Sequence, residues 1–269
     1  AGGIDLIVAS LSPVTELFGL PAAALPMALL RPLSGSGAFG VMAEAIISGI
    51  RKTELDIQIT VADPDGERRS TLEKLDLATT EDNAIAVESA DVVILAIKPQ
   101  HLDSVVPGLK VTLQPQQTLL SILAGVKMHS IGLRLNHDRL IRVMPNTPVQ
   151  IGHGMSVWTA TREVPIDVKD FTGKALSTLG DQIFVDQEKY IDLATALSAS
   201  GPAYVFKFIE AMIDAGVLLG MPTEMARRLV LQTVTGSGML VRESKKHPAE
   251  LSNTVTSPGG TTAAALRAL

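Results

Sequence analysis

The end of the chain combines a glycine turn with hydroxyl side chains, in a pattern typical of a small-anion site. Residues 255–269 read VTSPGGTTAAALRAL, where a Pro-Gly-Gly turn leads into an Ala/Leu-rich helical segment. Gly259 and Gly260 let the backbone turn with little obstruction, and Thr261 or Thr262 can cap the helix that follows. The unpaired amides of its first turn would then favour a carboxylate. The same residues are also compatible with an ordinary capped helix.

Four further motifs precede this turn. They read AIKPQ at residues 96–100, SILAG at 121–125, IRVMPNTP at 141–148 and LSASGPAYVF at 197–206. In this order and spacing, and together with the glycine turn, they resemble the pyrroline-5-carboxylate reductase family over roughly Met42 to Leu269. The resemblance implies the last step of proline biosynthesis, in which the cyclic imine 1-pyrroline-5-carboxylate is reduced to L-proline by NADPH or NADH.

A dinucleotide site needs a glycine turn between the first strand and the first helix, where the backbone approaches the pyrophosphate. The chain has a formal GxGxxG motif here, whereas the resemblance aligns the family's glycine pair with Ala38 and Gly40. Both alignments stay open. The candidate cofactor residues of this turn are Gly35, Gly37, Gly40, Val41 and Met42.

The segment ahead of these glycines looks unlike the family. A first strand of branched residues belongs there, but the apolar run at 28–33 includes Pro32, which a central strand tolerates badly. We therefore expect residues 1–33 to be atypical, and cofactor affinity is the property that this would affect.

The end of the second predicted strand carries opposing indications of cofactor choice. Asp63 follows that strand some twenty residues after the glycine turn, where a carboxylate would bind a ribose 2′-hydroxyl and repel a 2′-phosphate. Arg68 and Arg69 follow closely and could pair with a 2′-phosphate. Residues 63–66, DPDG, are also a good turn and helix cap in their own right. The choice between NAD and NADP therefore stays open.

Further cofactor contacts are implied by the resemblance, in loops that follow predicted strands. Ligands of doubly wound folds bind at the carboxyl ends of strands, although each of these loops also serves as a simple strand exit. The residues are Ala96, Ile97, Lys98, Pro99, Leu123, Ala124 and Gly125, with Asn146 near the nicotinamide and Asn83 on the adenosine side.

Substrate contacts are implied at two places. Glu188 matches a family position near the pyrroline ring, where its charge could favour the protonated imine. Thr261 and Thr262 match the turn that holds the substrate carboxylate, and Thr262 is the candidate catalytic residue that reaches the imine nitrogen. A protonated imine already attracts hydride, so the enzyme mainly has to orient the ring and hold its carboxylate.

The elements that must position these residues follow from the hydrophobic pattern. Short apolar runs alternate with amphipathic segments over the first two thirds, which favours a parallel sheet covered by helices on both faces. Strands are expected at 57–62, 92–97, 118–123, 140–143 and 155–159, and helices at 42–51, 67–75, 127–135, 202–219 and 223–243. The predicted fold class is an α/β Rossmann-like cofactor domain at 1–187, followed by an all-α substrate and dimerisation domain at 188–269.

Composition excludes several classes of function. The 269 residues carry a net charge of −5 and no cysteine, so neither nucleic-acid binding nor thiol chemistry is indicated. The longest apolar run, 17–30, contains two prolines and is too short to span a bilayer, and no basic leader precedes it. We expect a soluble cytoplasmic protein with no nucleic-acid or membrane partner. Its expected partners are the imine and further copies of itself, in a homodimer or a higher homo-oligomer built from dimers.

Two alternatives stay open. Relatives usually continue with about one more helix, and this early end together with the unusual start would suit an inactive or fragmentary relative that dimerises but binds cofactor poorly. A beta-hydroxyacid dehydrogenase would need a catalytic lysine, for which Lys207 is the candidate. The five histidines are not at metal-ligand spacing and are interpreted as surface or capping residues, so no metal is proposed.

Overall fold

A computed structural model describes residues 6–9, 25–30, 38–51, 57–63, 65–88 and 90–268. The chain forms two compact units, residues 1–202 and 203–269. The predicted domain boundary near Gln187 stays a prediction, because the helical part of the chain begins before the point where the compact units divide.

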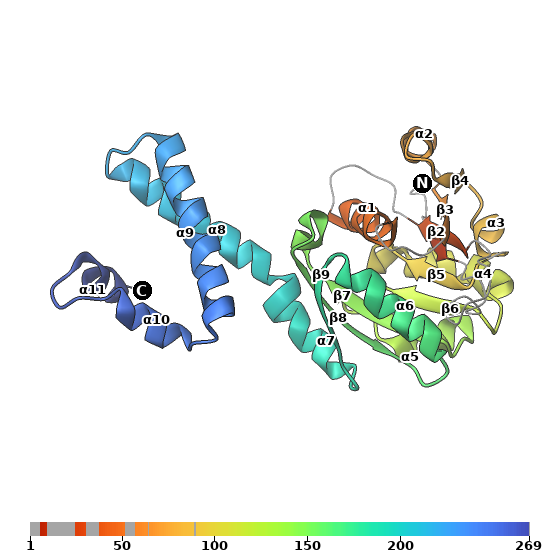
Figure 1. The fold of residues 1–269 in the computed structure, drawn as a ribbon. Coiled ribbons are helices and arrows are strands. Elements are labelled where there is room, and N and C mark those ends of the chain that lie inside the picture. The colour runs from red at the N-terminus through yellow and green to blue at the C-terminus, as the bar shows by residue number, and fades with distance from the viewer. Residues whose placement is uncertain are drawn as a thin grey trace, which may run out of the picture. The chain divides into compact units, whose positions relative to one another are not determined.

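One sheet runs through the first unit (Figure 1). Its strands are β1 (Leu6–Ala9), β2 (Leu25–Leu30), β3 (Ile57–Ala62), β4 (Ala78–Thr80), β5 (Val92–Leu95), β6 (Thr118–Ser121), β7 (Leu140–Pro145), β8 (Gly154–Ala160) and β9 (Gly180–Phe184). Their order is β1-β3-β2-β5-β6-β7-β8-β9, with β4 beside β3 and an additional pairing of β1 with β5.

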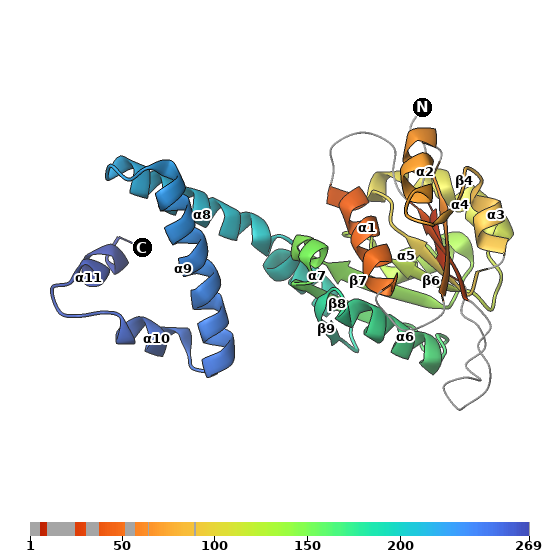
Figure 2. The same cartoon turned by 45° about the horizontal axis from the view of Figure 1, so that its top comes forward.

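Helices cover both faces of this sheet, with α1 and α6 on one face and α3, α4 and α5 on the other (Figures 1 and 2). The helices are α1 (Ala38–Arg51), α2 (Gly66–Glu73), α3 (Asn83–Glu88), α4 (Leu102–Thr112), α5 (Met128–Leu135), α6 (Ile166–Ser177) and α7 (Lys189–Ala194). Short helical turns are η2 (Pro99–His101), η3 (Thr147–Ile151) and the π-helical η4 (Thr195–Ala199). The layered arrangement is the one predicted.

The centre of the sheet is parallel, as expected. β2, β3, β5, β6 and β7 pair in parallel, in a register that sets Leu95 of β5 beside Ser121 of β6. The expectation of a parallel sheet is wrong at two strands. β1 pairs antiparallel with β3 and β5. β8 pairs antiparallel with β7 and sets Ile141 opposite Ala160. A short connection between neighbouring strands permits only the antiparallel arrangement.

The five strands predicted from apolar runs are all present. The strand before the glycine turn, β2, occupies residues 25–30 and not the apolar run at 28–33. β2 ends at Leu30, before Pro32, and pairs with both β3 and β5. Pro26 is its second residue and lies opposite Gln58 of β3, whereas the pairs with β5 begin only at Ala28. A proline near the start of a strand interrupts the ladder least.

The core of the first unit lies on the two faces of the parallel strands. All four residues of β5 are buried, which explains why this strand reads as a continuous apolar run without alternation. The apolar face of α1 repeats at Ala43, Ile46, Ile47 and Ile50, the spacing of one side of a helix. The first unit therefore encloses a core of its own.

The second unit is helical. It contains most of α8 (Gly201–Leu218), with α9 (Thr223–Ser244), α10 (Pro248–Thr254) and α11 (Thr261–Leu266). The helices predicted at 202–219 and 223–243 match α8 and α9 closely. Among the described residues of this unit, only Ala226 and Val230 are buried. Within the described part of the chain, no helix is both long and apolar enough to cross a membrane.

Candidate functional site

The loops that carry the predicted cofactor residues leave the sheet at one edge. The parallel strands β3, β5, β6 and β7 end there, at Ala62, Leu95, Ser121 and Pro145. The chain leads from β2 to β3 on one side and from β5 to β6 on the other, so the winding direction reverses between β2 and β5. Dinucleotides bind outside the carboxyl ends of strands at such a reversal.

The residues that bear on cofactor choice lie against one another after β3. Asp63 is fully buried, and its Oδ1 accepts a hydrogen bond of 2.8 Å from the Asp65 amide. Arg68 Nε lies 3.5 Å from Asp63 Oδ2. Arg69 donates to the Asp63 carbonyl at 2.7 Å and pairs with Glu81 at 3.5 Å. Asp65 also caps α2, as one interpretation of this turn predicted. Groups suited to either cofactor are therefore combined in one cluster.

The predicted glycine turn is described only in part. Gly35 and Gly37 lie outside the described residues, whereas Gly40, Val41 and Met42 lie in the first turn and a half of α1. Asn83 begins α3, and its side-chain Oδ1 is buried and has no hydrogen-bond partner among the described residues. An acceptor left in this condition is costly unless a ligand or water supplies a donor.

The loops after β5 and β6 lie side by side, joined by a hydrogen bond of 3.1 Å from the Ile122 amide to the Leu95 carbonyl. Ala96, Ile97 and Leu123 are buried, Lys98, Pro99 and Ala124 are half-buried, and Gly125 is exposed. Gly125 adopts a φ of 73°, and no heavy atom lies within 4 Å of the position a Cβ would take. The backbone here is open to close approach, and with the orphaned Asn83 oxygen it fits a bound dinucleotide.

The side chain of Asn146 is engaged within the protein. Its Oδ1 accepts from the Met155 amide at 2.8 Å, and its Nδ2 donates to the Ser198 carbonyl at 3.3 Å. Asn146 therefore fastens the end of β7 to both β8 and η4. Because both polar atoms of the side chain are hydrogen-bonded within the protein, a contact of Asn146 with the nicotinamide would involve its backbone or the flat face of its amide group.

Glu188 lies at the start of α7, in an ionic network around the buried Arg142. Its Oε1 accepts from Arg142 Nη1 at 2.8 Å and from the Met128 amide at 2.7 Å. Arg142 is 1 % exposed, and its Nη2 donates to Asp192 at 2.7 Å. Glu188 is therefore anchored to the sheet, a role for which its sequence position gave no indication.

Arg142, Met128 and Asp192 were missed by sequence reasoning. Arg142 could have been found, because it interrupts the otherwise apolar strand Leu140–Val143 and a buried charge must be paired. Its partners could not, since they come from segments far apart in the sequence.

The predicted substrate turn lies in the second unit. Gly259 adopts a φ of 70°, as the glycine turn predicted. The expectation that Thr261 or Thr262 caps the helix is wrong: Gly260 is the N-cap of α11, and the two threonines are its first two residues. Thr261 is exposed and Thr262 is half-buried.

The histidines differ from expectation at one position. His137 is buried, with Nε2 2.8 Å from the Gln117 carbonyl oxygen, and burial lowers the pKa of its imidazole. The prediction of a surface or capping role is therefore wrong for His137. It is confirmed for His247, whose Nδ1 accepts from the Ala249 amide at the start of α10. The described residues contain no group of three or more possible metal ligands among His, Cys, Asp and Glu.

Known proteins with similar sequences decide the family. The model for pyrroline-5-carboxylate reductase dimerisation matches residues 188–269, and that for NADP oxidoreductase, coenzyme F420-dependent, matches residues 38–125. The pyrroline-5-carboxylate reductase of Pseudomonas aeruginosa is 40% identical over 231 residues, covering 85% of each chain. The chain belongs to the pyrroline-5-carboxylate reductase family.

Solved structures of this family agree. The 1-pyrroline-5-carboxylate reductase of Streptococcus pyogenes has a TM-score of 0.76 at 32% identity, covering 87% of this chain and 88% of that one. The pyrroline carboxylate reductase of Plasmodium falciparum, solved with NADP bound, has a TM-score of 0.72 at 29% identity, covering 86% of each chain. The chain is thus an NAD(P)-dependent oxidoreductase, with an α/β cofactor domain and a helical domain of the dimerisation type.

Proposed function

We propose that this chain reduces 1-pyrroline-5-carboxylate to L-proline with NADPH or NADH, the last step of proline biosynthesis. The observation that carries the proposal is the 40% identity to a curated reductase over 85% of both chains. The reversal of winding at the carboxyl edge of the sheet supports a dinucleotide site in the same place.

In this proposal the carboxyl edge holds the cofactor. The loops at 96–99 and 123–125 line it, the start of α1 at Gly40 to Met42 receives the pyrophosphate, and Asn83 lies on the adenosine side. Gly35 and Gly37, which lie outside the described residues, stay predicted cofactor residues of the glycine turn. When bound, the cofactor supplies the hydride. The protein then has to orient the imine ring and exclude water, so no pair of acid and base side chains is required.

Thr261 and Thr262 would hold the substrate. Two hydroxyls and the unpaired amides at the start of α11 suit a carboxylate, and the Thr262 hydroxyl would reach the imine nitrogen. The prediction that Glu188 lies beside the pyrroline ring stays a prediction. The cytoplasmic location is likewise still a prediction.

Thr262 offers the direct test of the substrate turn. Thr262→Ala should lower kcat/KM for the imine about 100-fold, the effect of losing one donor aimed at a reacting centre. Thr262→Ser keeps the hydroxyl and should stay within about fivefold of wild type. Thr254→Ala removes a hydroxyl from α10 and serves as the matched control. Full activity of Thr262→Ala would overturn this assignment.

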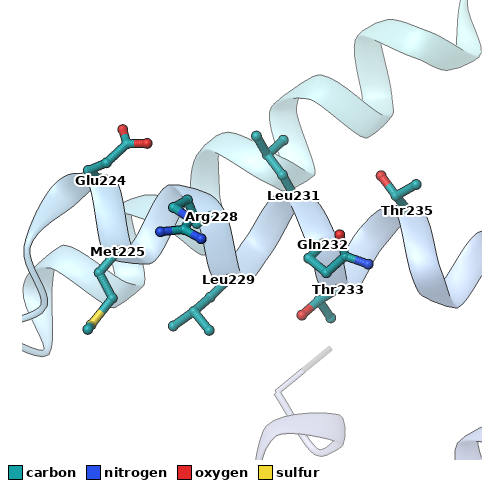
Figure 3. Close-up of a pocket in the computed structure, with 8 residues that line it drawn as sticks. All are labelled: Glu224, Met225, Arg228, Leu229, Leu231, Gln232, Thr233 and Thr235. Atoms are coloured by element: carbon teal, nitrogen blue, oxygen red, sulfur yellow. The ribbon is translucent and has the colours of Figure 1, made fainter.

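We further propose that the helical unit forms a homodimer, alone or within a higher oligomer built from dimers. A groove along α9 is lined by eight residues between Glu224 and Thr235, and among them Met225 and Leu229 point to the same side of that helix (Figure 3). Both side chains are more than half exposed in the single chain. An apolar face of this kind, in a segment of the dimerisation type, suits a second copy of the chain.

The surroundings of Lys207 do not favour it as the catalytic lysine of a hydroxyacid dehydrogenase. Lys207 is exposed and donates to Glu210 at 2.5 Å on its own helix. This hydrogen bond raises the pKa of the Lys207 amine, whereas a general base working near neutral pH needs a lowered one.

A further inference from the structure

Glu188 caps a helix that lies far from it in the sequence. Its Oε1 accepts a 2.7 Å hydrogen bond from the amide of Met128, a residue 60 positions earlier in the chain. Met128 is the first residue of α5, and its N–H is one of those that a helix cannot pair internally. A carboxylate at this position is favoured by the helix dipole and forms a charge-assisted hydrogen bond.

The sequence around α5 supplies no substitute for this cap. Lys127 occupies the N-cap position and its side chain makes no capping hydrogen bond, and the first turn of α5 contains no acidic residue. Arg142 holds the Glu188 carboxylate at 2.8 Å from within the sheet, where the arginine side chain is 1 % exposed. The carboxylate is thus fixed on one side by Arg142 and on the other fixes the start of α5.

Hydrogen bonds fix both ends of the loop between β6 and α5. At its beginning, the Ile122 amide donates to the Leu95 carbonyl of β5 at 3.1 Å. At its end, the Met128 amide donates to Glu188. The candidate cofactor residues Leu123 to Gly125 lie between these two attachments.

We propose that Glu188 is a positioning residue for the cofactor loop at 123–125. It acts through the Met128 N–H and is itself oriented by Arg142. The inference rests on the proposed function, because it assumes that this loop binds NAD(P)H. It differs from a role beside the pyrroline ring, since here the Glu188 carboxylate acts on the Met128 N–H and through it on the loop.

A fluorescence titration that measures NADPH binding to the full chain, in the absence of the imine, tests this proposal. Glu188→Ala removes the acceptor and should raise the Kd for NADPH about tenfold. Glu188→Gln keeps an oxygen that can accept from both Met128 and Arg142, and should stay within about threefold of wild type. Steady-state kinetics should show the same pattern in KM for NADPH.

The hydrogen bond can also be removed from its donor side. Met128→Pro deletes the N–H at the first position of α5, where proline is well tolerated. The preceding residue, Lys127, is already extended at φ −78° and ψ 147°, as a residue before proline must be. This variant should weaken NADPH binding about as much as Glu188→Ala, and the double variant should add little, because both remove the same hydrogen bond. Met128→Ala keeps the N–H and measures the loss of the partly buried Met128 side chain by itself. If Glu188→Ala does not fold, the Kd for NADPH of Met128→Pro tests the proposal.

Asp192→Ala is the matched control. Asp192 is the other carboxylate on Arg142, at 2.7 Å, and within the described residues it makes no hydrogen bond or ion pair with α5. Its loss should lower stability while leaving the Kd for NADPH within about twofold. Unchanged NADPH binding in both Glu188→Ala and Met128→Pro would overturn the proposal, as would a Glu188→Gln variant as weak as Glu188→Ala. A wild-type chain that binds NADPH but does not reduce the imine would instead overturn the proposed reaction alone.

Discussion

The two compact units of this chain place their apolar side chains in opposite ways. In the first unit Val61, Leu95 and Leu119 are fully buried between helices and sheet. In the second unit Phe206 is 60% exposed and Leu218 89% exposed. The first unit has a core that can support its own stability, whereas the second leaves an apolar surface that a single chain does not cover. We therefore expect cofactor binding and self-association to depend on different parts of the chain.

A core substitution in the first unit should give the largest effect on stability. Leu95→Ala removes a fully buried side chain from β5, and the cavity should cost about 2–5 kcal/mol of the free energy of unfolding. Leu133→Ala changes the same residue type where it is 70% exposed, and should cost less than about 0.5 kcal/mol. Urea denaturation measures both. Equal losses of stability from the two substitutions would contradict the assignment of Leu95 to a stabilising core of the first unit.

A charge on the exposed face of α9 should weaken self-association without unfolding the first unit. Leu229→Glu is expected to cost about 2 kcal/mol of association free energy, which is roughly a 30-fold weaker dimer. Arg242→Gln, which alters an exposed polar residue of the same helix, is the control. Light scattering after size exclusion gives the mass. A Leu229→Glu chain that stays dimeric at low concentration would show that this face is not the interface.

The smallest expected effect concerns pH. Burial lowers the pKa of His137 below its ordinary value of 6.5, so the folded state binds this proton less readily than the unfolded state. Stability should therefore fall as pH drops from about 6.5 toward the folded-state pKa, and the contribution should be fully present above that window.

Two histidine variants isolate this contribution. His137→Gln should flatten the fall in stability between pH 7.5 and 5.5, whereas His247→Gln, at an exposed helix cap in the second unit, should leave it unchanged. Urea midpoints at the two pH values measure the difference. A His137→Gln chain with the wild-type dependence would contradict the role assigned to burial.

Local sequence pattern was sufficient for most of the fold. Runs such as Val92–Leu95 identify buried strands because both faces of a parallel strand are covered. The weaker elements were missed: β4 has only three residues, and the strand β9 carries the polar sequence GDQIF. The antiparallel pairing of β8 was missed as well, because hydrophobicity does not record strand direction.

The site was predictable only where the motif itself makes the contact. The loops at 96–99 and 123–125 follow strand ends, and their common edge is a consequence of parallel pairing. The network of Arg142, Glu188 and the Met128 amide depends on tertiary packing across as many as 60 residues. No local pattern could have assigned Glu188 its partners.

The central claim is that this chain reduces 1-pyrroline-5-carboxylate. The most direct measurement follows the absorbance of NADPH, and separately of NADH, in the presence of the imine and the purified chain. We expect a decay that depends on both imine and protein, with L-proline as the product. The cofactor that is oxidised faster gives the preference that Asp63, Arg68 and Arg69 leave open. No decay with either cofactor, from a folded dimer, would contradict the account and favour an inactive relative that keeps the fold.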